Sequence, residues 1–187
     1  KHYPLAIWSG RGLPQLKQKV NISGLFYAGN HGLEISGPGL TFLHPAATRS
    51  RKLINRLYAQ LTAKLKKIPS IIENKRYSIS VHYRITPRRQ LAKLKKIFYN
   101  ITNPLARRKQ VIIKGGKKVL EILPPLKWHK GNALKLLQKH LGNIPVIYLG
   151  DDLTDEDVFR VLGKKDRGIL VGRRRGKTFA KERLQGI

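Results

Sequence analysis

A run of seven residues rich in carboxylates constrains this chain more than any other feature. Five of its ten Asp and Glu residues lie in residues 151–157, Asp-Asp-Leu-Thr-Asp-Glu-Asp, directly after the apolar segment 144–150. β-Branched residues and the final Gly150 make that segment typical of a buried strand that ends in a turn. In an open α/β sheet, functional sites form outside the carboxyl ends of such strands. The pattern therefore predicts a site at Asp151 and Asp152, whose oxygens suit a hard cation such as Mg²⁺.

Part of the acidic run has a simpler explanation. Acidic residues are favourable in the first turn of a helix, and a helix is expected at 157–162. This explanation suits Glu156 and Asp157. It does not account for Asp151 and Asp152, so we expect that pair to bind a metal ion.

The chain is strongly basic, with 39 Lys and Arg against ten acids and a formal net charge of +29. Such a charge predicts non-specific attraction to polyanions, including nucleic acid and anionic lipid. The basic runs are spread along the sequence, at 49–52, 64–67, 93–96, 107–109 and 173–175. No focused patch or aromatic-rich module typical of a nucleic-acid reader is present. We expect a generally basic surface, with polyanion binding as the alternative.

Composition excludes several classes of protein. An apolar content of 41% is enough for a core, so the chain is not a disordered polycation. It has no apolar run long enough to span a membrane and no signal-peptide pattern, so we expect a cytoplasmic protein. The absence of Cys excludes disulfides and thiolate metal sites. There is no Met either, and we expect the sequence to be a fragment.

Two patterns alternate along the chain. The outer parts show an α/β rhythm, with strands expected at 4–8, 24–28, 144–149 and 168–171 and helices at 13–20, 131–141 and 157–162. In the middle of the chain, amphipathic helices are expected at 46–68 and 87–99 and strands at 70–73 and 77–84. A hairpin around Gly115-Gly116 is expected at 109–122. We therefore expect an α/β core, residues 1–44 and 124–187, interrupted by an αββαββ insert at 45–123.

Four features in order resemble the haloacid dehalogenase superfamily of phosphatases. They are Ser9-Gly-Arg11 after a strand, the insert, Lys130 opening a helix, and the carboxylates at 151–155. More closely, the chain resembles the trehalose-6-phosphate phosphatase family. The resembling segments are 27–34 (Tyr-Ala-Gly-Asn-His-Gly-Leu-Glu), 73–75 (Glu-Asn-Lys), 80–84 (Ser-Val-His-Tyr-Arg), 116–122, 128–131 (Trp-His-Lys-Gly) and 150–159.

The resemblance implies a set of roles. Asp151 would hold Mg²⁺, with Asp152 and Asp155 shaping this metal site, while Ser9 and Lys130 would bind the transferring phosphoryl group. The insert would be a cap that closes over a sugar phosphate. The residues implied in substrate binding are Arg11, Asn30, His31 and Glu34 in the core and Lys75, His82, Arg84 and Glu121 in the cap.

Simpler roles remain open for several of these residues. Asn30, His31 and Glu34 would equally well stabilise a turn, and His82 and Arg84 would equally well form the exposed face of a strand. Glu121 has no obvious single basic partner in the sequence.

The sequence also departs from the family pattern. Its first motif, Asp-x-Asp-Gly-Thr, carries the nucleophile and the general acid/base, and this sequence does not contain it. Asn74, Arg76 and His129 replace residues more usual in the family. We therefore expect the full-length parent to hydrolyse trehalose 6-phosphate and these 187 residues alone to be inactive. The alternatives are a phosphatase for another sugar phosphate, or a non-catalytic module attached to a trehalose-phosphate synthase.

Overall fold

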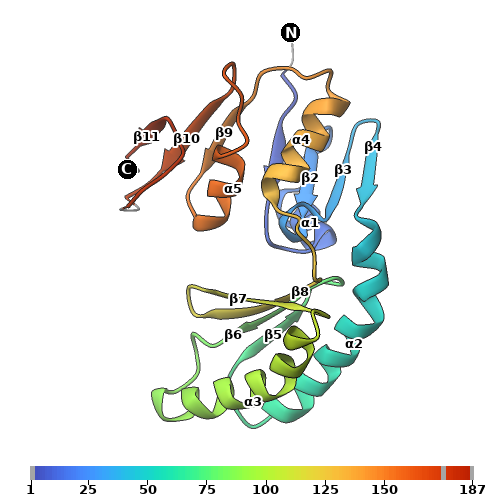
Figure 1. Cartoon of the computed structure of the whole chain (residues 1–187), viewed down its shortest axis with the longest axis vertical. Coiled ribbons are helices and arrows are strands. Elements are labelled where there is room, and N and C mark those ends of the chain that lie inside the picture. The colour runs from blue at the N-terminus through green and yellow to red at the C-terminus, as the bar shows by residue number, and fades with distance from the viewer. Residues whose placement is uncertain (1–2, 174–175, 186–187) are drawn as a thin grey trace. The chain divides into compact units, whose positions relative to one another are not determined.

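The chain folds into two compact units. The computed structural model describes residues 3–173 and 176–185. Unit 1 comprises residues 1–42 and 128–187, and unit 2 comprises residues 43–127 (Figure 1). In the described part, no helix is long and apolar enough to cross a membrane. Arg174 and Arg175 of the basic run at 173–175 lie outside the described residues.

Unit 1 contains two sheets, three α-helices and two 3-10 turns in its described part. Its elements are β1 (Ala6–Trp8), α1 (Leu13–Val20), β2 (Phe26–Gly29), η1 (Asn30–Gly32), β3 (Glu34–Gly37), β4 (Leu40–Leu43), α4 (Lys130–His140), β9 (Ile147–Gly150), η2 (Leu153–Asp155), α5 (Glu156–Phe159), β10 (Arg167–Val171) and β11 (Glu182–Leu184). One sheet has the order β1-β2-β3-β4 and the other the order β11-β10-β9. β1 and β2 are parallel, as are all three strands of the second sheet.

Helix α4 packs against both sheets of unit 1. Its Ala133 belongs to a core cluster with Ala28 and Ile35 of the first sheet. The next residue, Leu134, packs with Tyr148 and other apolar side chains of the second sheet. Successive apolar positions of one helix therefore contribute to two cores.

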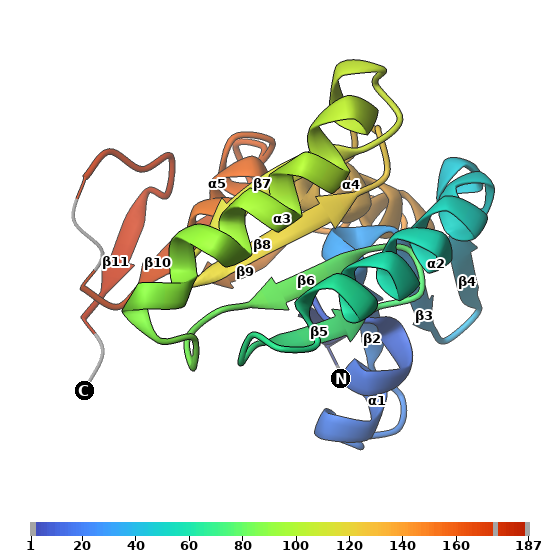
Figure 2. The ribbon, with the colours of Figure 1, turned by 90° about the horizontal axis from the view of Figure 1, so that it is seen from below.

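Unit 2 is an antiparallel sheet with two long helices on one face. Its elements are α2 (Pro45–Leu65), β5 (Ile71–Asn74), β6 (Ile79–His82), α3 (Arg88–Arg107), β7 (Ile112–Gly116) and β8 (Val119–Leu123). The strand order is β5-β6-β8-β7, and Figure 2 shows both helices across the same face. Fully buried side chains at helical spacing, such as Ile54, Leu61 and Leu94, meet Ile79 and Val81 of the sheet. The αββαββ order expected from the sequence is confirmed.

Several element boundaries differ from the expectation. α3 continues past residue 99 to Arg107, with Pro104 inside it, because Ile101 and Leu105 still pack against the core of unit 2. The expected helix 157–162 ends at Phe159. The hairpin turn lies at Lys117-Lys118 rather than at Gly-Gly, with Lys118 in the left-handed region at a φ of 60°. The β3–β4 pair was not expected at all.

Candidate active site

The acidic run follows β9 directly, as expected, but its carboxylates differ in exposure. Asp151 and Asp152 are exposed, whereas Asp155 is 3% exposed. Gly150 makes this arrangement possible, since a Cβ there would lie 2.5 Å from the Cβ of Asp155. The chain can therefore fold the Asp155 carboxylate back beneath the end of the strand.

Asp155 accepts four hydrogen bonds from the surrounding residues. Its Oδ1 accepts from Lys130 Nζ at 2.8 Å and from the Tyr148 hydroxyl at 2.7 Å. Its Oδ2 accepts from the backbone N–H groups of Asp151 and Asp152, at 3.0 and 3.1 Å. Both oxygens are thus engaged within the protein, which suits a residue that positions its neighbours.

Lys130 occupies the first position of α4, where a cation opposes the helix dipole. Its buried ammonium is neutralised by Asp155 and lies 4.0 Å from Asp152 Oδ1. Close packing of α4 fixes this position, because a Cβ at Gly131 would collide with the carbonyl oxygen of Asp157. The two carboxylates explain why a lysine is stable at the start of this helix.

The electrostatics of the cluster follow from burial and from this pairing. Burial alone would raise the pKa of Asp155, but the charge of Lys130 and the hydrogen bonds from Lys130, Tyr148 and the backbone outweigh it and lower that pKa. Burial, and then the neighbouring Asp155 charge, raise the pKa of Tyr148. Asp155 is therefore a stable anion and Tyr148 a permanent hydrogen-bond donor.

The exposed acids offer oxygen ligands at the end of β9. Asp152 Oδ1 accepts from Thr154 N and from Asp155 N, at 2.6 and 3.2 Å, so it also caps the following turn. Asp151 projects its carboxylate at the surface. Within the described residues no group of three or more His, Cys, Asp or Glu could hold a metal ion. Mg²⁺ usually takes only one or two carboxylates together with water and substrate phosphate, so Asp151 and Asp152 fit it as a partial ligand set.

The Ser9 loop follows the parallel strand β1. Ser9 Oγ accepts from the backbone N–H of Arg11 at 3.1 Å, and the Ser9 carbonyl oxygen accepts from His31 N at 3.1 Å. A Cβ at Gly10 would lie 2.7 Å from the His31 ring. The loop and His31 are therefore held together, while the Arg11 side chain is exposed and reaches Gln15.

Asn30 and Glu34 are buried and hydrogen-bonded to each other. Asn30 Nδ2 donates to Glu34 Oε2 at 2.6 Å, and the same oxygen accepts from Leu13 N at 3.4 Å. Asn30 N also donates to the carbonyl oxygen of Arg11 at 2.6 Å. These contacts join η1 to the start of α1, and they support the turn-stabilising role for Asn30 and Glu34.

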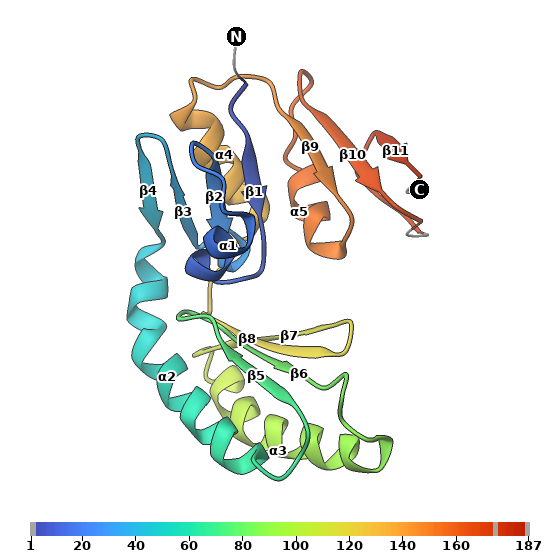
Figure 3. The ribbon, with the colours of Figure 1, turned by 180° about the vertical axis from the view of Figure 1, so that it is seen from behind.

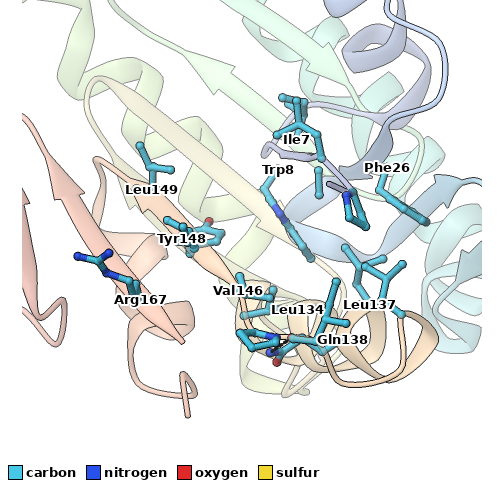
Figure 4. A pocket seen from close by; sticks show the side chains of 18 of the residues that line it. Ile7, Trp8, Phe26, Leu134, Leu137, Gln138, Val146, Tyr148, Leu149 and Arg167 are labelled. Atoms are coloured by element: carbon cyan, nitrogen blue, oxygen red, sulfur yellow. Dashed lines mark hydrogen bonds between the residues drawn. The ribbon is translucent and has the colours of Figure 1, made fainter. Parts of the chain in front are cut away.

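A large cleft opens beside this cluster, with a volume of about 860 Å³. Ile7 and Trp8 of β1 line one side, Tyr148 and Leu149 of β9 line the other, and α4 lies between them (Figure 4). Lys130, Asp151 and Asp155 belong to its lining. The acidic cluster therefore borders a mainly apolar cleft.

A second polar cluster lies on the sheet of unit 2. Lys75 Nζ donates to Glu121 Oε1 at 3.0 Å, and Ser80 Oγ donates to the same oxygen at 2.8 Å. Next to it, His82 Nε2 lies 3.2 Å from Glu73 Oε2. The strand register pairs Ser80 with both Glu73 and Glu121, which places these side chains on the face opposite the helices.

The geometry corrects two expectations about unit 2. Glu121 does have a basic partner, Lys75. The two residues lie 46 positions apart, so no local sequence pattern predicts their contact. Arg84 does not project from a strand, because β6 ends at His82 and Arg84 lies in the exposed turn that follows.

Two residues of these clusters were missed in the sequence. Tyr148 was treated only as part of an apolar strand, although a hydroxyl-bearing residue within such a run signals a buried hydrogen bond. The sequence gives Ser80 no role beyond its place in the segment 80–84 that resembles the family. Its position two residues before His82 places both on one face of the strand, which was the available signal.

The α/β architecture is that of the haloacid dehalogenase fold class. A family model described as trehalose-phosphatase matches residues 1–183, and the chain belongs to that family. A probable trehalose-phosphate phosphatase D of Arabidopsis thaliana is 34% identical over 202 residues, covering 99% of this chain and 54% of the relative. This chain thus spans about half the length of the curated relatives it matches.

Solved structures support the same fold. A trehalose-6-phosphate phosphatase related protein superposes with a TM-score of 0.81 at 22% identity, covering 97% of this chain and 75% of the other. The C-terminal domain of a trehalose synthase regulatory protein from Candida albicans gives a TM-score of 0.76 at 11% identity, covering 98% and 78%. The α/β fold class expected from the sequence is confirmed.

Proposed function

We propose that this chain is part of a Mg²⁺-dependent phosphatase that releases trehalose and phosphate from trehalose 6-phosphate. The observation that carries the proposal is the cluster at the end of β9, where the buried pair Lys130–Asp155 lies beneath the exposed carboxylate of Asp151. Membership of the trehalose-phosphatase family supports trehalose 6-phosphate as the substrate, and the names of the relatives agree with this assignment.

Each residue of the cluster has a distinct task in this proposal. Asp151, assisted by Asp152, would hold Mg²⁺, which when bound neutralises charge on phosphoryl oxygens. Lys130 would supply a second positive charge to the phosphoryl group, together with the Ser9 loop. Asp155 would act as a positioning residue, because its four hydrogen bonds fix Lys130 and the backbone of Asp151.

Unit 2 would act as the cap, and the unit 1 segments as the catalytic core. Lys75, His82 and Glu121 offer a cluster of polar groups suited to sugar hydroxyls. Arg84 and His31 are further proposed contacts, and Arg11 would reach the phosphate. The family's Asp-x-Asp-Gly-Thr motif, which would carry the nucleophile, is not contained in these 187 residues.

The test is phosphate release by the complete natural polypeptide. We expect turnover of trehalose 6-phosphate to require Mg²⁺ and to fall by about three orders of magnitude in Asp151→Asn, since a metal ligand is lost. Asp157→Asn is the matched control in the same acidic run. Full activity in excess chelator, or an active Asp151→Asn variant, would exclude the assignment.

The second candidate function is a non-catalytic module beside a trehalose-phosphate synthase. The superposition on a regulatory-protein domain favours this alternative at the level of the fold. A complete natural polypeptide that lacks phosphatase activity, yet co-purifies with a synthase, would replace the enzyme proposal by this one.

A further inference from the structure

Helices α2 and α3 form a layer of unit 2 that contains no acidic residue. The two helices lie side by side below the sheet of unit 2 in Figures 1 and 3. The segments 43–72 and 87–111, which include both helices, contain many Lys and Arg residues but no Asp or Glu. The two acids of unit 2, Glu73 and Glu121, belong to the polar cluster on the opposite face of the sheet. The positive charge of the helix layer is therefore not neutralised by carboxylates of its own.

A pocket with a volume of about 360 Å³ opens in this layer, beside the end of α2 and the first turns of α3. Four lysines line it. Lys64 belongs to the last turn of α2, Lys66 and Lys67 follow that helix, and Lys93 belongs to α3. All four side chains are exposed, and their flexible stems allow the ammonium groups to converge on one ligand. Four cations around one pocket favour a ligand with more than one anionic group.

The helix dipoles explain only part of this cluster. Cations are favourable near the C-terminus of a helix, which accounts for Lys64, Lys66 and Lys67 at the end of α2. α3 shows the opposite pattern. It begins with Arg88 and Arg89, its first turn contains no acid, and no described side chain caps it. An anion in the pocket, which the same turn of α3 lines, would offset this unfavourable arrangement.

Gln90 adds an uncharged acceptor to the pocket. Its side chain belongs to the lining, and its Oε1 is buried without a hydrogen-bond partner among the described residues. An unpaired buried oxygen is unfavourable, so a donor supplied by a ligand would stabilise it. An ionised phosphate oxygen accepts hydrogen bonds, whereas a hydroxyl group also donates them. The pocket therefore suits a ligand that carries hydroxyl groups beside its phosphates.

We propose that this pocket binds a small polyol that carries two or more phosphate groups. The phosphates would accept hydrogen bonds from the lysine ammonium groups, and a hydroxyl would donate to Gln90 Oε1. A volume of about 360 Å³ is that of a site for one small molecule. The ligand is either a free polyol phosphate or the headgroup of a membrane lipid, which share this chemistry. The site goes beyond the proposed phosphatase, in which none of these residues takes part.

The first test is calorimetric titration of the complete natural polypeptide with inositol trisphosphate, at physiological salt and with a chelator that removes divalent metal ions. We expect saturable binding. Tripolyphosphate has a comparable charge but no alcohol hydroxyl. It should bind about fivefold more weakly, because the hydrogen bond to Gln90 is not made. Equal affinity for the two probes, or no saturable binding of inositol trisphosphate, would overturn the proposal.

Matched variants locate the binding. Lys67→Gln and Lys93→Gln should each weaken the affinity for inositol trisphosphate about tenfold, since each removes a charge-assisted hydrogen bond. Lys52→Gln removes the same charge from an exposed position of α2 outside the pocket, and it should have little effect. Gln90→Leu should abolish the preference over tripolyphosphate, because Leu has no acceptor. Equal losses in the Lys52 and Lys67 variants would indicate a diffuse effect of charge and would overturn the pocket.

Vesicle binding distinguishes the two sources of the ligand. Phosphatidylcholine vesicles that contain phosphatidylinositol bisphosphate are sedimented with the protein. Sedimentation that inositol trisphosphate competes away, and that Lys67→Gln loses, supports the site with a lipid headgroup as its ligand. Binding of inositol trisphosphate without sedimentation supports the site with a free polyol phosphate.

Two competitors test whether the bound probe occupies this pocket or another site. Excess trehalose 6-phosphate should not displace inositol trisphosphate, because the proposed active-site residues Lys130 and Asp151 belong to unit 1. Displacement would assign the probe to the proposed active site and overturn the pocket, whatever the phosphatase activity. Duplex DNA should compete only weakly at physiological salt. Stronger competition by DNA than by unlabelled inositol trisphosphate would make the layer a nucleic-acid surface and would also overturn the proposal.

Discussion

Lys130 Nζ lies 2.8 Å from Asp155 Oδ1, and the two side chains are only 7% and 4% exposed. The two residues lie 25 positions apart, one at the start of α4 and the other after β9. This pair ties the helix to the carboxyl end of the strand, and Asp151 and Asp152 remain exposed beside it.

Removal of one partner of this pair should be strongly destabilising. Lys130→Met leaves a buried carboxylate without its cation, and we expect a loss of about 3–5 kcal/mol in the free energy of unfolding. Urea unfolding followed by tryptophan fluorescence measures it. Lys135→Met, an exposed position on the same helix, is the control and should stay within about 0.5 kcal/mol. Similar losses in the two variants would contradict the buried pair.

Stability should fall at acid pH. Burial would raise the pKa values of Asp155 and Asp166, but their hydrogen bonds, and for Asp155 the charge of Lys130, lower them. A carboxyl whose pKa is lower when folded contributes its full stabilisation above the unfolded value of about 4 and loses it as the pH falls through the folded value. The urea midpoint should therefore be flat above about pH 5 and decrease below pH 4. A midpoint that rises on acidification would contradict these directions.

Asp166 should be important for stability although it lies outside the proposed site. Its carboxylate accepts from Gly163 N, Val146 N and Gln138 Nε2, at 2.7, 2.9 and 3.1 Å. In Asp166→Asn the amide nitrogen cannot accept the first of these bonds, and we expect a loss of about 1–3 kcal/mol by urea unfolding. Glu182→Gln breaks an exposed pair with Arg167 and should shift the midpoint much less. The reverse order would refute this account.

Substrate choice should depend on the polar cluster of unit 2. In the complete natural polypeptide, Glu121→Gln should lower kcat/KM for trehalose 6-phosphate by about 10–100-fold, because the site loses a carboxylate acceptor for sugar hydroxyls. Hydrolysis of para-nitrophenyl phosphate should hardly change. Gln retains the size of the side chain, so an equal loss on both substrates would indicate a structural role for Glu121.

Polyanion binding should be electrostatic and without sequence preference. Unit 2 holds more than half of the 39 Lys and Arg residues but only two of the ten acids, Glu73 and Glu121. If the chain contacts six to ten phosphates, DNA affinity should fall by roughly 10³–10⁵ between 50 and 200 mM salt. Fluorescence anisotropy with two unrelated duplexes measures both properties. Tight binding to one duplex at physiological salt would favour a dedicated nucleic-acid function.

Local patterns predicted the elements well. Apolar spacing located α2 and α3, and the run before Gly150 located β9, because these signals depend on near neighbours. The same logic failed for α3 beyond residue 99, where packing of Leu105 outweighs the cost of Pro104. β4 was also missed, although the two-residue turn at Pro38 and Gly39 and the alternating burial of Leu40–Leu43 are local signals of a hairpin.

The candidate site was predictable as a set of residues but not as a network. The sequence placed Lys130 and the acids near one sheet edge, yet it could not show that Asp155 is saturated by hydrogen bonds while Asp151 stays exposed. Pairings such as Lys75 with Glu121 depend on strand register, which no local pattern encodes.

The aromatic rings of Phe42 and Trp128 stack in unit 1, with centroids 5.5 Å apart. These two residues are the last before unit 2 and the first after it, so the chain leaves unit 1 and returns to it at a single place. An insertion such as unit 2, which joins unit 1 at one place, can be exchanged without changing the fold of unit 1. A short Gly-Ser bridge from Phe42 to Trp128 should therefore yield a miniature protein that keeps the β9 cluster, and grafting other modules at this junction would give chimaeras with new selectivity.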